Sequence, residues 1–572
     1  MLGIMKRVFA LLDREERRGI LPLLLMMIVG ALIDSLSITL IIPFVSSTMG
    51  LQTPSGGLLA GVMRWLVPDI GTPHALVRSI LLLILIFWAK NAYLLGEHAV
   101  QFRYTAAIRR RIQNFLIHFY LTRPYRFFLE EDSGEIMRTV STDSDHFFCL
   151  LNCILQFFTG GIVTLVMAAC VFCIHPRITL LLMVVLAAEY VIVARVLQPL
   201  LMKHGKRYRV ELGRANGHLI EILSGIKNIK VNGRETFFER RYAARVKGLI
   251  AAARMERTFK NSPKLLIEAG TVSAMLIYLY LKSRGGEDLG VMVPILSAFV
   301  VAAARILPCM SEASNAVSQA GYFESALTKV EEVCRQAAED PRELEEAPPM
   351  EMGGEITLEG ICYSYADRNL TVLDHADMTI RRFEHIGLVG VSGVGKTTLV
   401  DVLLGLLEPQ EGRIRMDGVP VSTDSAAWRG MFAYIPQKIF LMNGSILENV
   451  AFGEEAEADE ARVWAALERA QLAEFVRGLP DGLRTQIGEA GARLSAGQIQ
   501  RVGIARAFYR DPPIFVFDEA TSALDADTEQ ALLAVIRQLR GRKTVLQISH
   551  RTNTLEDCDA VYRLSDGRLE KA

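Results

Sequence analysis

The segment at residues 390–397 has the composition of a phosphate-binding loop. It reads Gly-Val-Ser-Gly-Val-Gly-Lys-Thr. Its glycines let consecutive backbone N–H groups turn inward around a phosphate, while Lys396 reaches the β- and γ-oxygens and the Thr397 hydroxyl binds Mg²⁺. The apolar stretch 384–389 predicts a strand before the loop, and 398–404 predicts a helix whose N-terminus faces the phosphates. The pattern predicts a nucleoside triphosphate site.

A second stretch carries the acids that such a site needs. Residues 514–518 read Ile-Phe-Val-Phe-Asp, which predicts a buried strand ending in a carboxylate, and Glu519 follows directly. We expect Asp518 to hold a Mg²⁺-bound water and Glu519 to polarise the water that attacks the γ-phosphate. Together with the loop upstream, these acids indicate triphosphate hydrolysis.

The surrounding sequence places this site in a membrane protein. The chain has 572 residues, 51% of them apolar. Apolar runs of about twenty residues, the length that spans a bilayer as a helix, lie at 21–47, 76–97, 148–174, 177–197, 264–283 and 290–311. The fifth is the weakest, because Lys264 and Glu268 lie at its start.

Charge sets the expected topology. The connections 98–147 and 198–263 are long, helical in periodicity and rich in arginine and lysine, so the positive-inside rule places both in the cytoplasm with the N-terminus. The formal net charge is zero, and the basic clusters adjoin membrane helices, which argues against nucleic acid as a partner. The basic N-terminal segment has no cleavage site, so we expect it to be retained. Cys170 and Cys173 lie inside an apolar run and are interpreted as packing thiols rather than a redox pair.

A linker separates the membrane part from the rest. Residues 336–350 are acidic and rich in proline, which is typical of a linker, and the pattern after them alternates strands and helices. We therefore predict a transmembrane domain at 1–335, a linker at 336–350 and a nucleotide-binding domain at 351–572.

Further motifs appear in a characteristic order around the phosphate loop. Residues 494–498 read Leu-Ser-Ala-Gly-Gln, 522–525 read Ser-Ala-Leu-Asp, Gln437 ends Tyr-Ile-Pro-Gln, and His550 lies in Ile-Ser-His-Arg. In this order they resemble the signature motif, D-loop, Q-loop and switch histidine of the ABC transporter family. Tyr365 lies where the family places an aromatic that stacks on adenine. The resemblance covers the whole chain.

The resemblance implies a fold and a site. The fold is an α-helical membrane domain with six transmembrane helices of the ABC exporter type, joined to an α/β P-loop NTPase domain of the ABC type. The implied cofactors are ATP and Mg²⁺, with Thr397, Gln437 and Asp518 at the metal and Glu519, His550 and Gln437 as catalytic residues. The implied ATP contacts are Tyr365, Gly390, Ser392, Gly393, Gly395, Lys396, Thr397, Thr398, Ser495, Gly497 and Gln498.

The resemblance also implies a second chain. In this family the signature helix of one ATPase domain closes over the nucleotide held by the loop of another, so a chain with one of each motif needs a partner, most simply a second copy of itself. Ala496 stands where the family usually has glycine; we interpret it as a tolerated variant, and the alternative is that its methyl group slows closure of the dimer. Short coupling helices are expected at 131–136 and 218–223. Glu489, in a stretch resembling the exporter X-loop, either contacts one of these or is a solvated surface acid.

Charges within the spans bear on the substrate. Lys90, Lys264 and Arg305 are candidates for a cavity that binds an anionic headgroup, and the alternative is that each is ion-paired, with Asp34, Glu97, Glu189 or Glu268 as partners. Residues 58–67 predict a short interfacial helix at the outer leaflet. These features resemble bacterial lipid-linked oligosaccharide flippases, which implies a polyprenyl-pyrophosphate glycan as substrate and the inner membrane as location.

Two other functions remain open. A lipid or multidrug exporter uses the same architecture, although a drug cavity would hold more aromatic residues and fewer cations. An ATP-gated channel or membrane regulator is the alternative from a different class, and the presence of Glu519 argues against it, because a regulator does not need the catalytic glutamate.

Overall fold

The described part of the chain forms two units. The computed structural model describes residues 1–39, 73–174, 176–284, 289–344, 347–365, 370–454, 458–488, 491–520, 526–550 and 555–572. Unit 1 comprises Met1–Leu121 and Ser133–Pro341. Unit 2 comprises Thr122–Asp132 and Arg342–Ala572.

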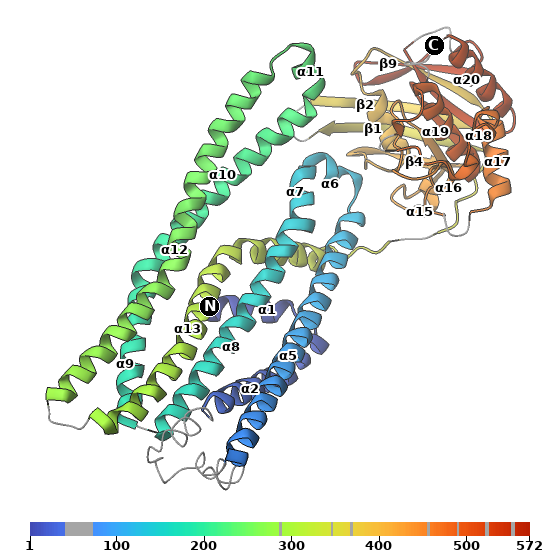
Figure 1. The fold of residues 1–572 in the computed structure, drawn as a ribbon. Helices are drawn as coiled ribbons and strands as arrows, with labels where there is room; N and C mark the ends of the chain where they lie inside the picture. Colours follow the sequence, from blue (N-terminus) through green and yellow to red (C-terminus); the bar gives the residue numbers. More distant parts are fainter. Residues whose placement is uncertain are drawn as a thin grey trace. The chain divides into compact units, whose positions relative to one another are not determined.

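Unit 1 is helical (Figure 1). Its α-helices are α1 (Leu2–Leu11), α2 (Arg14–Thr39), α5 (Pro73–Leu121), α7 (Ser133–Arg138), α8 (Ser144–Ile174), α9 (Pro176–Ile192), α10 (Gln198–Ser224), α11 (Ile226–Val231), α12 (Glu235–Arg284) and α13 (Leu289–Glu339). π-Helical turns at Thr139–Asp143 and Val193–Leu197 precede α8 and α10. Three stretches of the described residues are long and apolar enough to cross a membrane: Arg14–Ser37, Ile80–Leu121 and Ser133–Ala169.

Several helices are much longer than a bilayer requires. α5, α12 and α13 contain 49, 50 and 51 residues, whereas about 20 residues suffice to span the hydrocarbon core. The runs 264–283 and 290–311 lie within α12 and α13, and 177–197 covers α9 with the turn after it. Hydropathy marks only the apolar section of each helix. Each of these helices continues beyond its apolar section through residues that include many charged side chains.

Helix α1 is fixed to the end of α13. Ile4 and Val8 are buried on one side of α1. The Arg7 guanidinium donates to Glu331 at 2.6 Å and to Glu324 at 3.0 Å. α13 continues through Glu339, so the first residues of the predicted linker are helical. The prolines that suggested a linker begin only after that helix ends.

Unit 2 is built on two sheets. One has four strands in the order β2-β1-β4-β5 and is antiparallel. The other has six in the order β10-β9-β3-β8-β7-β6, parallel except for the edge pair β10-β9. The strands are β1 (Glu355–Tyr365), β2 (Leu370–Arg381), β3 (His385–Val389), β4 (Glu411–Met416), β5 (Val419–Pro420), β6 (Phe432–Ile435), β7 (Ile514–Asp518), β8 (Thr544–Ser549), β9 (Ala560–Ser565) and β10 (Arg568–Lys571).

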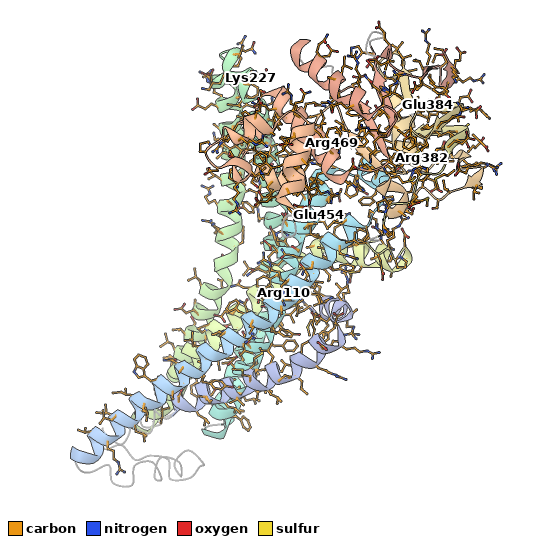
Figure 2. The ribbon with its side chains drawn as sticks, turned by 90° about the vertical axis from the view of Figure 1, so that its right-hand side faces the viewer. Arg110, Lys227, Arg382, Glu384, Glu454 and Arg469 are labelled. Carbon is orange, nitrogen blue, oxygen red and sulfur yellow. The ribbon has the colours of Figure 1, made fainter. Side chains whose placement is uncertain are left out.

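Unit 2 also contains α-helices. They are α6 (Tyr125–Glu130), α14 (Lys396–Leu403), α15 (Ala426–Gly430), α16 (Ile446–Ala451), α17 (Glu460–Arg469), α18 (Ala473–Arg477), α19 (Ala496–Arg510) and α20 (Ala526–Leu539). Trp428 is fully buried in the core between the sheets, and its indole N–H donates to the Leu403 carbonyl at 2.9 Å. Charged side chains lie at the surface, among them Arg382 and Glu384 in the turn before β3 (Figure 2). Because β3, β7 and β8 are neighbours, the residues at their carboxyl ends meet at one edge.

Candidate active site

The phosphate loop connects β3 to α14, as its sequence predicts. β3 is buried along most of its length, and α14 begins at Lys396. Gly393 and Gly395 have φ values of 82° and 112°, which a side chain would disfavour. A Cβ atom on Gly390 would lie 2.7 Å from the Leu564 carbonyl oxygen. The loop therefore needs these glycines both for its turn and for its close approach to β9.

Lys396 lies inside the curve of the loop. Its ammonium donates to the carbonyl oxygens of Gly390 at 2.8 Å and Val391 at 3.1 Å, and the side chain is nearly fully buried. Ser392, Gly393 and Thr397 are exposed at the same loop. The cation is held at the centre of the loop while the groups predicted to bind phosphate and metal face outward.

Glu519 gathers three of the predicted residues around one carboxylate. The Gln437 amide donates to its Oε2 at 3.2 Å. Its Oε1 lies 3.8 Å from the Lys396 ammonium and 3.9 Å from His550 Nδ1. The Glu519 backbone has φ = 47°, in the left-handed region, and its N–H donates to Ile548 of the adjacent strand. This sharp turn after β7 aims the side chain at the loop.

Asp518 ends the buried strand β7 and is held by a residue that the sequence did not reveal. The Tyr434 hydroxyl donates to Asp518 Oδ2 at 2.9 Å. Burial raises the pKa of Asp518. Burial, followed by the charge of Asp518, also raises the pKa of Tyr434 well above its ordinary value. The hydrogen bond fixes one carboxylate oxygen, Oδ2.

A second acid lies near Asp518. Asp401 is on α14, one helical turn after Thr397, and burial together with the charge of Asp518 raises its pKa to about 6. Tyr434 and Asp401 were both missed. An acid one turn into a helix that begins at a phosphate loop, and an aromatic three residues before Gln437, are the patterns that would have indicated them.

Tyr365 is tied to the loop helix. Its hydroxyl and the Thr398 hydroxyl are 3.1 Å apart, and its ring meets Tyr363 edge to face. The end of β1 is thereby joined to the first turn of α14. Two residues expected to contact ATP thus contact each other, and the Tyr365 ring stands next to the loop that would hold the phosphates.

Ser495 and Gln498 form the N-terminal cap of α19. The Ser495 hydroxyl accepts from the Gln498 N–H at 3.3 Å, and the Gln498 side chain accepts from the Ser495 N–H at 2.8 Å. Ala496 and Gly497 are the first residues of the helix. Among the described residues, no hydrogen bond joins this cap to the phosphate loop. A helix N-terminus capped in this way can bind an anion.

The two expected coupling helices stay predictions. The first stretch, 131–136, begins in the segment Thr122–Asp132, which contains α6 and is grouped with unit 2, and continues into α7 of unit 1. Pro124, at φ = −64° and ψ = 154°, is the N-cap of α6. The second expected stretch, 218–223, is the end of α10.

Lys90 is buried in an ion pair. It is 4% exposed, and its ammonium lies 2.9 Å from Asp34 Oδ1 in the packing of α5 against α2. The structure shows the ion pair that was the alternative for this lysine in the sequence analysis, and a role in substrate binding stays a prediction. Lys264 lies in α12 and Arg305 in α13, with side chains outside the described set.

Three further expectations lie outside the described residues. They are the interfacial helix at 58–67, the D-loop at 522–525 and Glu489. All three stay predictions.

Comparison with known proteins gives consistent matches along the chain. The family model "ABC transporter" matches residues 373–522, and "ABC transporter transmembrane region" matches residues 21–301. An ATP-dependent lipid A-core flippase of Cupriavidus metallidurans is 29% identical over 99% of this chain and 92% of its own length. One from Burkholderia orbicola is 31% identical over 77% of this chain and 74% of its own length.

A solved structure is similar over nearly the whole chain. It is a bacterial Atm1-family ABC exporter with ATP bound, which aligns with a TM-score of 0.75 at 24% identity, covering 98% of this chain and 96% of that one. At this identity the similarity shows the fold.

Proposed function

The chain belongs to the ABC transporter family as an exporter-type half-transporter, and from that premise we propose that it moves an anionic, lipid-linked substrate to the outer face of a bacterial inner membrane. The predicted fold class, a helical membrane domain joined to an ABC-type ATPase domain, is confirmed, and ATP hydrolysis is coupled to transport. The number of spans and the proposed boundaries at 1–335, 336–350 and 351–572 stay predictions.

The described geometry supports specific roles in hydrolysis. We assign Lys396 and the loop N–H groups to the β- and γ-phosphates, and Glu519 to the attacking water, which it would hold and deprotonate. Gln437 and His550 contact that carboxylate and orient it. Tyr365 would stack on the adenine.

The donor set at the end of β7 fits Mg²⁺. The Thr397 hydroxyl, the Asp518 carboxylate and the Gln437 side-chain amide are the oxygen-bearing groups that this hard cation prefers. When bound, Mg²⁺ would neutralise charge on the β- and γ-phosphates. Tyr434 keeps the Asp518 carboxylate in one orientation, which leaves its other oxygen for a metal-bound water.

A second chain would complete the site. Ser495, Gly497 and Gln498 stand at the start of α19 without a hydrogen bond to the phosphate loop among the described residues. A helix N-terminus stabilises an anion. We propose that the α19 N-terminus of one protomer closes over the γ-phosphate held by its partner, in a homodimer with two active sites.

The substrate proposal is supported by the named relatives. The lipid A-core flippase of C. metallidurans aligns with nearly the whole chain, and this observation favours a lipid substrate over a soluble drug. The sequence favours a polyprenyl-pyrophosphate oligosaccharide. Lipid A-core is the second candidate, and the relatives favour it. Since Lys90 is paired with Asp34, anion binding would fall to Lys264, Arg305 or groups beyond the described side chains.

Reconstituted protein distinguishes these substrates. We would measure ATPase activity and lipid movement in proteoliposomes containing polyprenyl-pyrophosphate oligosaccharide, lipid A-core or neither, with hydrophobic drugs in a parallel series. The expected result is stimulation by one anionic lipid and its ATP-dependent appearance in the outer leaflet. Stimulation by drugs with no effect of either lipid would refute the proposal.

A catalytic variant separates transport from a channel or regulator. Glu519→Gln is expected to bind ATP but to lose hydrolysis by about 100-fold or more, because a general base contributes 10²–10⁴-fold. A flippase should lose lipid movement in parallel. Substrate passage that continues at full rate in the variant would favour an ATP-gated channel.

A further inference from the structure

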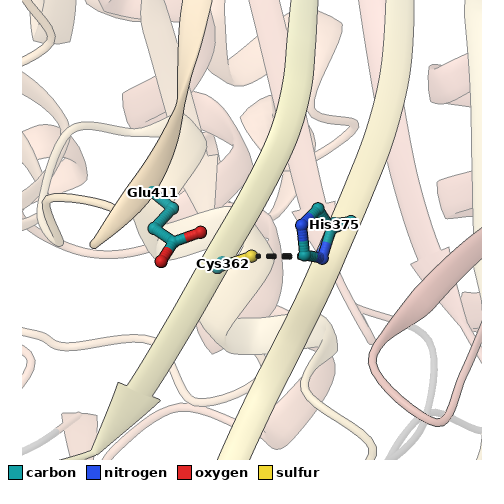
Figure 3. Close-up of side chains that lie close together, drawn as sticks. All are labelled: Cys362, His375 and Glu411. Carbon is teal, nitrogen blue, oxygen red and sulfur yellow. Dashed lines mark hydrogen bonds between the residues drawn. The ribbon is translucent and has the colours of Figure 1, made fainter.

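Three metal-ligating side chains lie together on the antiparallel sheet of unit 2. Cys362 is on β1, His375 on β2 and Glu411 on β4, and β1 is the middle strand of the three. One ligand atom from each residue lies within 4.8 Å of the other two (Figure 3). None of them belongs to the proposed ATP site.

Irregular strand pairing produces this arrangement. Cys362 and Glu411 are direct partners across β1 and β4, so their side chains share a face. The register shifts beside Cys362 on both edges of β1, and His375 adopts φ = 49° in β2. Non-glycine residues are uncommon in the left-handed region, where histidine is among the better tolerated, and such bulges re-aim a side chain. Here the bulge turns the imidazole toward Cys362.

The distances fit a tetrahedral zinc ion. Cys362 Sγ lies 3.6 Å from His375 Nδ1. Zinc bonds of about 2.3 Å to sulfur and 2.0–2.1 Å to nitrogen, at the tetrahedral angle, would separate these atoms by about 3.5 Å. The His375 backbone N–H also donates to the sulfur at 3.3 Å. The sulfur and the imidazole nitrogen already have the separation that zinc requires, and a Glu411 oxygen, within 4.8 Å of both, completes the set on moving closer.

One neighbour competes for the same nitrogen. Asp374 Oδ1 lies 2.8 Å from His375 Nδ1, and its Oδ2 accepts from Arg568. Metal binding would exchange the imidazole–carboxylate hydrogen bond for a metal–nitrogen bond. Arg568 would retain its hold on Asp374.

We propose that Cys362, His375 and Glu411 bind one zinc ion, with water in the fourth position. On binding, the thiol loses its proton to solvent, and the thiolate sulfur, neutral Nδ1 and a Glu411 oxygen become ligands. The ion ties β1, β2 and β4 together. β1 continues to Tyr365, so the ion stabilises the strand that carries the proposed adenine-stacking ring. Nothing in this proposal depends on the transported substrate.

Cobalt substitution in the full-length chain tests the site. Purified protein in detergent is treated with a chelator and titrated with Co²⁺. We expect one equivalent per chain, with tetrahedral d–d absorption and a sulfur-to-cobalt charge-transfer band, both abolished by added Zn²⁺. Cys362→Ser should lose the charge-transfer band, and Glu411→Gln should weaken binding by at least tenfold. Cys558→Ser, a cysteine elsewhere in unit 2, is the matched control and should keep the full spectrum.

Variants must be shown to be folded. His375→Asn suits the left-handed backbone, because asparagine tolerates that region, and should lose Co²⁺ binding while still binding a fluorescent ATP analogue. Zn²⁺ should raise the unfolding temperature of the wild type and leave that of Cys362→Ser unchanged. A titration without a charge-transfer band, or a spectrum unchanged in Cys362→Ser, would overturn the proposal and leave only a thiol–imidazole hydrogen bond.

Discussion

The buried Lys90–Asp34 pair allows a direct test of what this lysine does. The pair joins α5 to α2, with side-chain exposures of 4% and 12% and an N–O distance of 2.9 Å. The ammonium also lies 4.9 Å from the centre of the Phe87 ring. We consider Lys90→Met, Asp34→Asn and the double variant, which removes both charges and keeps similar volumes.

The size of the effect follows from this geometry. At 2.9 Å and an effective dielectric constant of about 20, the attraction is about 6 kcal/mol before desolvation is subtracted. Removing one partner of a buried pair typically destabilises a protein by 3–5 kcal/mol, because the other charge stays buried without its counter-ion. We therefore expect each single variant to lose about 3 kcal/mol, and the double variant to return to within about 1 kcal/mol of wild type.

Unfolding by SDS in mixed micelles, followed by circular dichroism, measures these free energies, and lipid movement is measured on the same preparations. If the Lys90–Asp34 pair has only a structural role, the effects of the two substitutions on the free energy of unfolding should be strongly coupled. Transport should then survive in the double variant. Additive losses would refute the pairing. A double variant that is stable yet transports at least tenfold more slowly would refute the structural role and return Lys90 to the substrate site.

Three other predictions concern unit 2. Tyr434→Phe removes a hydrogen bond to the Asp518 carboxylate, which is worth about 1.5–3 kcal/mol. The Mg²⁺ concentration for half-maximal ATPase activity should therefore rise about tenfold or more. An unchanged Mg²⁺ dependence would show that the Tyr434 hydroxyl does not position Asp518. Asp401 has a pKa raised to about 6 from 3.8; its ionised form therefore destabilises the folded state above pH 6, and this penalty disappears as the pH falls toward 4. Asp401→Asn should accordingly be more stable than wild type by about 1–2 kcal/mol at pH 7.5, after allowance for partial exposure, with the difference in unfolding temperature shrinking by pH 5, and a pH-independent difference would contradict this. Trp428→Phe should lose about 1–3 kcal/mol in denaturant unfolding, because the Leu403 carbonyl loses its indole donor, whereas Trp464→Phe, at a partly buried site, should lose less.

Local chemistry explains what the sequence predicts well. The glycines at 393 and 395 allow the positive φ values that the loop needs, and the strand ending at Asp518 is a continuous apolar run. Both features can be predicted from residues that are neighbours in the sequence. The family resemblance added Gln437 and His550 to the predicted site, and in the structure both lie next to the Glu519 carboxylate.

Pairings between distant elements were the part that sequence patterns did not reveal. Lys90 could be assigned to a cavity or to an ion pair, and only the packing of α5 on α2 decides between them. Tyr434 reaches Asp518 because β6 and β7 are adjacent in the sheet, an order that a single sequence does not indicate. The same holds for His375, whose distance to Cys362 depends on a register shift.

The grouping of Thr122–Asp132 with unit 2 has a consequence for biosynthesis. This stretch is translated well before Arg342, where the rest of the unit begins. At about 5–20 residues per second, about 10 to 40 s pass between the synthesis of this stretch and that of Arg342. Tyr125 and Phe128 in this stretch are each 41% exposed, and burial, followed by the charge of Asp401, raises the pKa of Tyr125. During synthesis the stretch lacks the contacts that group it with Arg342–Ala572, and a fragment beginning at Arg342 would lack them as well. Unit 2 can therefore be completed only after the C-terminal part of the chain has been made, although Thr122–Asp132 is made early.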